Sequence, residues 1–132
     1  MALKPETVAS IQLFNWVRSM PDVEPYVFHI ANERKCTPFE GRILKRMGVS
    51  RGVSDYMIAI PSGPYHGMFL ELKVGSNKPS EEQQKFLDDM TAKGYMAVCV
   101  WGYEAAKIAI ETYLKMRNQN AFLATYSGHP IC

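Results

Sequence analysis

Two acidic residues and a lysine form the most informative group in this sequence. Glu71-Leu72-Lys73 follows Asp55 after sixteen residues, with a glycine-containing turn between them. In a strand Glu71 and Lys73 would share one face, because side chains i and i+2 point the same way. A divalent metal held by Asp55 and Glu71 would offset the cost of desolvating both acids, with Lys73 near the attacking water. That arrangement predicts hydrolysis of phosphodiesters.

The ligand types indicate which metal could bind. Mg²⁺ and Mn²⁺ prefer oxygen ligands, so Asp55, Glu71, the backbone carbonyl of Leu72 and water would suffice. Lys73 could orient or deprotonate the water, or stabilise the phosphate in the transition state. Burial and nearby carboxylates shift the pKa of a lysine in opposite directions, so both roles stay open.

A surface ion pair between Glu71 and Lys73 is the simpler alternative, and it would contribute about 0–1 kcal/mol. Two features argue against it. Phe69 is on the same face as Glu71, which indicates a covered face rather than a solvated one. Gln83 and Phe86 lie in the first turns of a following helix that can return across that face.

The elements that would position these residues can be outlined from apolar periodicity and turn signals. The predicted helices cover residues 5–20, 39–47, 80–93 and 103–117, and the predicted strands cover residues 26–30, 55–60, 68–74 and 96–101. Ser80 with Gln83 three positions later is typical of a capping box. The last strand is apolar enough to be buried on both faces, and the residues expected to face inward from the last helix are Ala106, Ile108, Ala109, Ile110, Tyr113 and Leu114. This order predicts an α/β fold with a small mixed sheet flanked by helices.

Length and composition indicate one domain spanning residues 1–132. The hydrophobic share of 47% and the charged share of 21% are ordinary for a globular protein. No apolar run is long enough for a transmembrane helix, and the first residues lack the apolar core of a signal peptide. The three cysteines have no metal-ligand spacing, so we expect reduced thiols in a cytoplasm, with Cys99 packed as a small hydrophobe.

The charge distribution points to one basic segment. The net charge is only +2, but residues 34–51 contain one acid, Glu40, and six basic residues: Arg34, Lys35, Arg42, Lys45, Arg46 and Arg51. Such a cluster can neutralise DNA phosphates and make binding dependent on salt. A solvated helix face is the equally simple alternative.

Together these residues resemble the VRR-NUC branch of the PD-(D/E)XK nuclease superfamily. The resemblance rests on residues 52–55 (Gly-Val-Ser-Asp), residues 69–73 (Phe-Leu-Glu-Leu-Lys), and the start of the helix at Ser80 with Gln83 and Phe86. It covers roughly residues 26–101 and is similar to the stand-alone phage and bacterial members. Ser54 departs from the pattern, which usually has proline there; this removes rigidity before Asp55 but keeps the acid.

The resemblance implies a restriction-endonuclease-like fold. It also implies that Asp55 and Glu71 are metal ligands, that Lys73 is a base or an electrostatic stabiliser, and that Gln83 is an accessory active-site residue. Such families place a glutamate of the first helix near the metal, and Glu6 is the candidate. A favourable interaction with the helix dipole explains Glu6 equally well, and Gln83 could serve only the capping box.

The leading hypothesis is a metal-dependent DNA endonuclease that selects branched DNA, such as four-way junctions, and uses no nucleotide cofactor. The resemblance implies a homodimer, and the first helix or the aromatics Tyr26 and Trp101 could supply its interface. A non-catalytic DNA-binding module with a nuclease-like fold is the alternative, although the intact Asp-Glu-x-Lys set argues against it. A nuclease acting on RNA is a weaker hypothesis.

Overall fold

The computed structural model describes residues 2–30 and 36–118. Its elements, in chain order, are α1 (Pro5–Val17), a 3-10 turn (Glu24–Tyr26), β1 (Val27–His29), α2 (Pro38–Arg46), β2 (Tyr56–Ile58), β3 (Met68–Lys73), α3 (Glu81–Ala92), β4 (Met96–Trp101) and α4 (Gly102–Lys115). The predicted elements are all present. Their ends differ by a few residues: α1 ends at Val17 rather than near residue 20, and Asp55 lies just before β2 instead of within it.

The four strands form one mixed sheet in the order β1-β2-β3-β4. β1, β2 and β3 pair antiparallel, whereas β3 and β4 pair parallel. Parallel neighbours require a crossover connection, and α3 provides it. The predicted α/β class with a mixed sheet is therefore confirmed.

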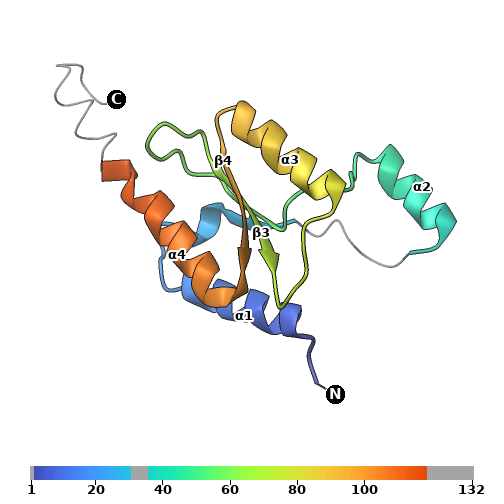
Figure 1. Ribbon diagram of the computed structural model, residues 1–132, viewed down its shortest axis with the longest axis horizontal. Helices are drawn as coiled ribbons and strands as arrows, with labels where there is room; N and C mark the ends of the chain where they lie inside the picture. Colours follow the sequence, from blue (N-terminus) through green and yellow to red (C-terminus); the bar gives the residue numbers. More distant parts are fainter. Residues whose placement is uncertain (1, 31–35, 119–132) are drawn as a thin grey trace.

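The helices cover the two faces of the sheet unequally (Figure 1). α1 and α4 pack together on one face, where α4 contacts β3 and β4. α3 covers the other face and contacts β4. The main core lies between the sheet and the α1–α4 pair, with Leu70 and Leu72 of β3 facing Leu13 of α1 and Ile110 of α4. The opposite face of β3 is thereby directed toward α3.

Two details of the predicted burial are wrong. Residues 96–100 of β4 are only half-buried, because β4 is an edge strand. Ile108 of α4 is 60% exposed, since the buried stripe runs through Ala106, Ile110, Tyr113 and Leu114 and Ile108 lies off it. On α1, Val8 and Ile11 are exposed, whereas Ala9, Leu13 and Val17 are buried.

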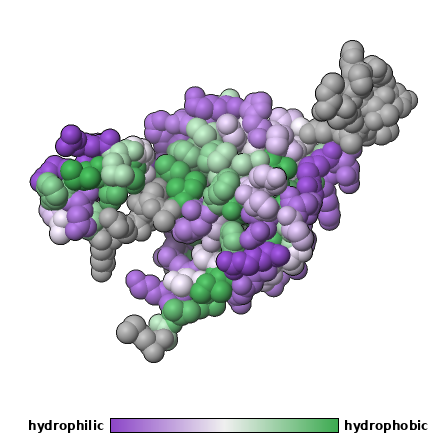
Figure 2. All heavy atoms as spheres, turned by 180° about the vertical axis from the view of Figure 1, so that it is seen from behind, coloured by the Kyte–Doolittle hydropathy of each residue, from purple (hydrophilic) through white to green (hydrophobic). Residues whose placement is uncertain are grey.

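α2 projects away from the rest of the chain (Figures 1 and 2). None of its residues is buried, and Phe39 is 64% exposed. Figure 2 shows hydrophilic and hydrophobic side chains mixed on its surface. Thr37 caps the helix by accepting a hydrogen bond from the backbone N–H of Glu40. Local capping rather than packing therefore supports α2.

Among the described residues, no helix combines the length and the apolar character that crossing a bilayer requires.

Candidate active site

β3 places Glu71 and Lys73 together on the face that α3 covers. Both point away from Leu70 and Leu72, because side chains alternate along a strand. The Nζ atom of Lys73 lies 3.3 Å from Oε1 of Glu71. Glu71 is 2% exposed and Lys73 is 15% exposed, so this is a buried ion pair. The alternative of a solvated surface pair is excluded.

Asp55 is brought to this pair by the antiparallel register of β2 and β3. Tyr56, the next residue, is the Cα partner of Leu70. Beyond that pair the backbone N–H of Leu72 donates a hydrogen bond of 2.8 Å to Oδ2 of Asp55. The backbone carbonyl of Asp55 accepts a hydrogen bond from the N–H of Ile30 at 2.6 Å. Both the main chain and the carboxylate of Asp55 are thus held in place.

The carboxyl group of Asp55 has a raised pKa. Burial is the largest cause, because removing a carboxylate from water disfavours its charged form. The hydrogen bond from Leu72, the charges of Lys73 and His29, and a hydrogen bond with Glu71 oppose the rise without cancelling it. Asp55 and Glu71 are therefore close neighbours in a partly desolvated site.

Gln83 joins the same cluster from α3. Its Nε2 atom donates a hydrogen bond of 3.2 Å to Oε1 of Glu71. Its Oε1 atom accepts one of 2.8 Å from the N–H of Ser80, whose hydroxyl in turn accepts from the N–H of Gln83. The predicted capping box is confirmed, and the same amide also contacts Glu71. The two roles expected for Gln83 do not exclude each other.

Aromatic side chains cover the sheet beside these polar groups. The ring of Phe69 meets that of Phe86 edge to face at 5.1 Å and that of Tyr95 at 5.3 Å. Phe69 is 8% exposed. The covered face inferred from Phe69 and Phe86 is therefore present, and it lowers the local dielectric around Glu71.

Glu6 is not brought into this cluster. Its carboxylate accepts a hydrogen bond of 3.1 Å from Nδ2 of Asn77, in the loop after β3. Across residues 2–30 and 36–118, no group of three or more His, Cys, Asp or Glu side chains is arranged to hold a metal ion. The structure supplies two neighbouring carboxylates, Asp55 and Glu71, and not the three that the resemblance implies.

The predicted DNA-contacting residues divide into two groups. Arg34 and Lys35 lie outside the described residues. Arg42, Lys45 and Arg46 are exposed on α2, and Arg51 is exposed in the segment that leads from α2 to Asp55. The backbone of this segment passes close to α3 at Gly52. The φ angle of Gly52 is +84°, and a Cβ atom there would lie 2.7 Å from the carbonyl oxygen of Glu82. The segment that follows the basic helix therefore lies against the first turn of α3.

Two contacts of the site were not expected from the sequence. The N–H of Leu72 donates to the carboxylate of Asp55, a contact that is separate from the metal contact expected of the Leu72 carbonyl. Cys99, expected to act as a small hydrophobe, is the Cα partner of Glu71 in the β3–β4 register. Burial and then the charge of Glu71 raise the pKa of its thiol, which favours the neutral form. Only strand register could reveal this proximity, since no spacing relates residues 71 and 99.

Comparisons with known proteins identify the fold. No family model and no curated protein matches the chain. A solved structure described as "VRR_NUC domain protein" matches with a TM-score of 0.75 and 26% sequence identity, over 88% of this chain and 93% of that chain. The match covers nearly the whole of both chains and agrees with the motif-based resemblance. In its fold and in its sequence motifs, the chain is therefore similar to the VRR-NUC family.

Proposed function

We propose that the protein is a divalent-metal-dependent DNA endonuclease whose active site consists of Asp55, Glu71, Lys73 and Gln83. The main support is the contact between the buried Glu71 carboxylate and Nζ of Lys73 at 3.3 Å, with Asp55 beside it. The fold of a VRR_NUC domain protein around this cluster adds to it. Removing these charged groups from water costs folding free energy. Their presence in the interior therefore favours a functional role over a purely structural one.

The donor set fits a hard divalent cation. Two neighbouring carboxylates share one ammonium group, so an excess of negative charge remains that a divalent cation would offset. Mg²⁺ is commonly bound by one or two carboxylates, with water and substrate phosphates filling the other positions. Asp55 and Glu71 would hold Mg²⁺ or Mn²⁺, and the carbonyl of Leu72 is the proposed backbone ligand. Glu6 is not part of the proposed site, because it pairs with Asn77.

When bound, such a cation supplies Lewis-acid stabilisation of the phosphate and activation of water. Lys73 contributes a positive charge beside Glu71, suited to stabilising the charge that develops on the phosphate. Gln83 holds Glu71 in one orientation through its hydrogen bond. The N–H of Leu72 does the same for Asp55. The chain's own residues thus preorganise both carboxylates before DNA binds.

DNA binding is assigned to the basic arm, by which we mean α2 with Arg51. Arg42, Lys45 and Arg46 are exposed there, and the arm ends four residues before Asp55. Lysine and arginine neutralise backbone phosphates without reading sequence. We therefore propose that the basic arm, together with Arg34 and Lys35, binds backbone phosphates of the DNA next to the active site.

The preferred substrate is branched DNA, cleaved by a homodimer. Leu3, just before α1, is 60% exposed, and Val8 and Ile11 on α1 are 40% and 45% exposed. A self-complementary contact would cover these side chains. Two active sites related by a two-fold axis suit a substrate with matching strands, such as a four-way junction.

Cleavage of labelled DNA tests this function. Purified protein is incubated with single-stranded, duplex, flap and four-way DNA in Mg²⁺, Mn²⁺ or EDTA. We expect cleavage with either metal, none in EDTA, and loss of cleavage in Asp55→Ala and Lys73→Ala. Lys85→Ala is the matched control, because Lys85 is 76% exposed and pairs with Asp89 on α3. Its activity should equal that of the wild type.

Undiminished cleavage by either active-site variant would reject the site. Binding of DNA without cleavage in both metals would instead favour a non-catalytic module. Sedimentation of the wild type gives the oligomeric state separately, so that a monomer rejects the homodimer without affecting the catalytic proposal.

A further inference from the structure

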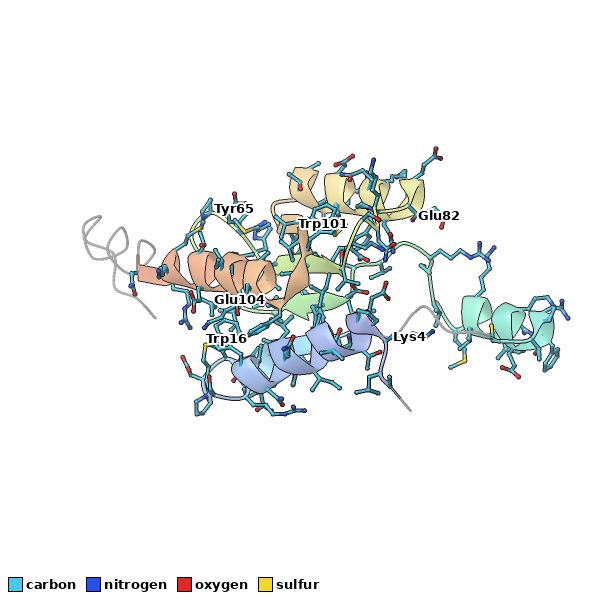
Figure 3. The ribbon with its side chains drawn as sticks, turned by 60° about the horizontal axis from the view of Figure 1, so that its bottom comes forward. Lys4, Trp16, Tyr65, Glu82, Trp101 and Glu104 are labelled. Atoms are coloured by element: carbon cyan, nitrogen blue, oxygen red, sulfur yellow. The ribbon has the colours of Figure 1, made fainter. Side chains whose placement is uncertain are left out.

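Trp101 lies beside Lys73 at the end of the sheet. It is the last residue of β4 and the Cα partner of Lys73 in the parallel β3–β4 register. Partners in register project to the same side of a sheet, so the indole and the lysine share the face of Glu71. Figure 3 labels Trp101, which lies where β4 ends and α4 begins. An aromatic ring therefore lies next to the proposed active site.

The indole is held in place but not covered. Its Nε1–H donates a hydrogen bond of 2.7 Å to the carbonyl of Asn77, in the loop after β3. The side chain of Asn77 is in turn bonded to Glu6 of α1. Trp101 nevertheless remains 45% exposed. Its polar atom is satisfied within the protein, while apolar ring surface faces solvent.

Such a ring is suited to one kind of contact. Bases of single-stranded nucleic acid stack on exposed aromatic side chains, whatever the base, because every base has a π-face. Bases inside an intact duplex are already stacked on their neighbours and are not available. A ring fixed beside Lys73 can therefore take a base only where the DNA next to the scissile phosphate is unpaired.

We propose that Trp101 is a stacking platform for an unpaired base that flanks the phosphate cleaved at Asp55, Glu71 and Lys73. The proposal rests on the proposed nuclease function and narrows its substrate class. DNA with unpaired nucleotides at the branch, such as a flap, a bubble or a junction with an opened centre, is favoured over a continuous duplex. Glu6 and Asn77 act as positioning residues for the ring.

Measurements of DNA binding in the absence of cleavage test whether Trp101 stacks on an unpaired base. The chain has two tryptophans, so Trp16→Phe leaves Trp101 as the only one. In EDTA, a flap oligonucleotide should quench the fluorescence of this variant, and a duplex of the same sequence should not. In the wild-type background, Trp101→Ala should weaken flap binding about 5- to 100-fold by fluorescence anisotropy, whereas Trp101→Phe should retain most of the affinity.

A substrate change provides a second, independent measurement. An abasic nucleotide at the unpaired position removes the stacking base, so wild type and Trp101→Ala should bind that flap equally. Tyr26→Ala is the matched control. Tyr26 is 51% exposed and directly precedes β1, at the opposite edge of the sheet from β4. Its loss should leave flap binding unchanged.

The outcomes separate this inference from the proposed function. If the wild type cleaves DNA and Trp101→Ala binds flaps as tightly as the wild type, the platform is rejected and the nuclease stands. If the wild type binds no DNA, both are rejected. If Trp101→Ala converts a dimer into a monomer and weakens flap and duplex binding equally, Trp101 belongs to a protein interface and the platform is rejected.

Discussion

Nε2 of Gln83 donates a hydrogen bond of 3.2 Å to Oε1 of Glu71, and this contact links the first turn of α3 to β3. The same amide closes the capping box of α3 through its oxygen. One side chain therefore stabilises the helix and orients an acidic residue of the proposed active site.

Gln83→Ala should lose both roles, whereas Ser80→Ala should lose only the cap. Removing the Ser80 hydroxyl costs about 0.5–2 kcal/mol of stability and leaves the contact with Glu71 intact. Gln83→Ala should cost more, since a hydrogen bond to a charged group contributes about 1.5–3 kcal/mol. We expect cleavage to fall at least ~10-fold in Gln83→Ala only. Urea unfolding and cleavage rates measure the two effects, and equal cleavage losses in both variants would contradict separate roles.

Asp55→Asn should abolish cleavage and yet stabilise the metal-free protein. Burial raises the pKa of Asp55 above its ordinary value of 3.8, so the folded state favours the neutral carboxyl group more than the unfolded state does. The stability associated with that preference is present below pH 3.8 and is lost as the pH rises through the folded-state pKa. At neutral pH we expect asparagine to raise Tm in EDTA, because it removes the buried charge.

The gain in Asp55→Asn should shrink as the pH falls toward 3.8. Asp89→Asn is the matched control, because Asp89 is 48% exposed and its change should stay within about 0.5 kcal/mol. Thermal unfolding between pH 4 and 8 is the measurement. A lower Tm for Asp55→Asn at neutral pH would show that the carboxylate is not a stability cost.

Ser54→Ala should increase stability, and Ser62→Ala should decrease it. Both serines are buried, but the hydroxyl of Ser54 has no hydrogen-bond partner among the described residues. The hydroxyl of Ser62 donates to the carbonyl of Tyr113. Removing an unsatisfied buried hydroxyl should gain about 1 kcal/mol, and removing a bonded one should cost about as much. Chemical denaturation decides the point, and two changes of the same sign would contradict it.

Arg42→Ala and Lys45→Ala should weaken DNA binding by similar factors on every sequence. Each loses one phosphate contact, so the slope of log K against log salt should fall by about 1 per substitution. Lys85→Ala, which removes a cation from α3 rather than from the basic arm, should leave the slope unchanged. Anisotropy titrations between about 50 and 200 mM salt provide the slopes. If the slope of log K against log salt is unchanged in both variants, α2 makes no contact with DNA phosphates and is only a solvated helix.

Tyr113→Phe should change how stability depends on alkaline pH. The hydroxyl of Tyr113 donates to the carbonyl of Ile60 at 2.6 Å, and burial raises its pKa to about 12. Its contribution is present below pH 10, the ordinary value, and is lost as the pH rises toward 12. The variant should therefore be less stable by about 1 kcal/mol at neutral pH, with the gap closing above pH 10. Parallel stability curves would contradict this.

Much of the local structure was predictable because it depends on short spacings. The i, i+2 relation put Glu71 and Lys73 on one strand face, and the spacing of Ser80 and Gln83 indicated the cap. The order of helices and strands likewise followed from apolar periodicity.

Other relations required the tertiary structure, because they join residues that no short spacing connects. Strand register brought the N–H of Leu72 to Asp55, Cys99 to Glu71 and Trp101 to Lys73. The edge position of β4 left it half-buried, and the lack of a packing partner left α2 projecting. The sequence by itself determined which groups are available for chemistry and their local conformation. Only the packing of α3 and β4 against β3 decided which of them meet, since those contacts depend on long-range pairing and burial.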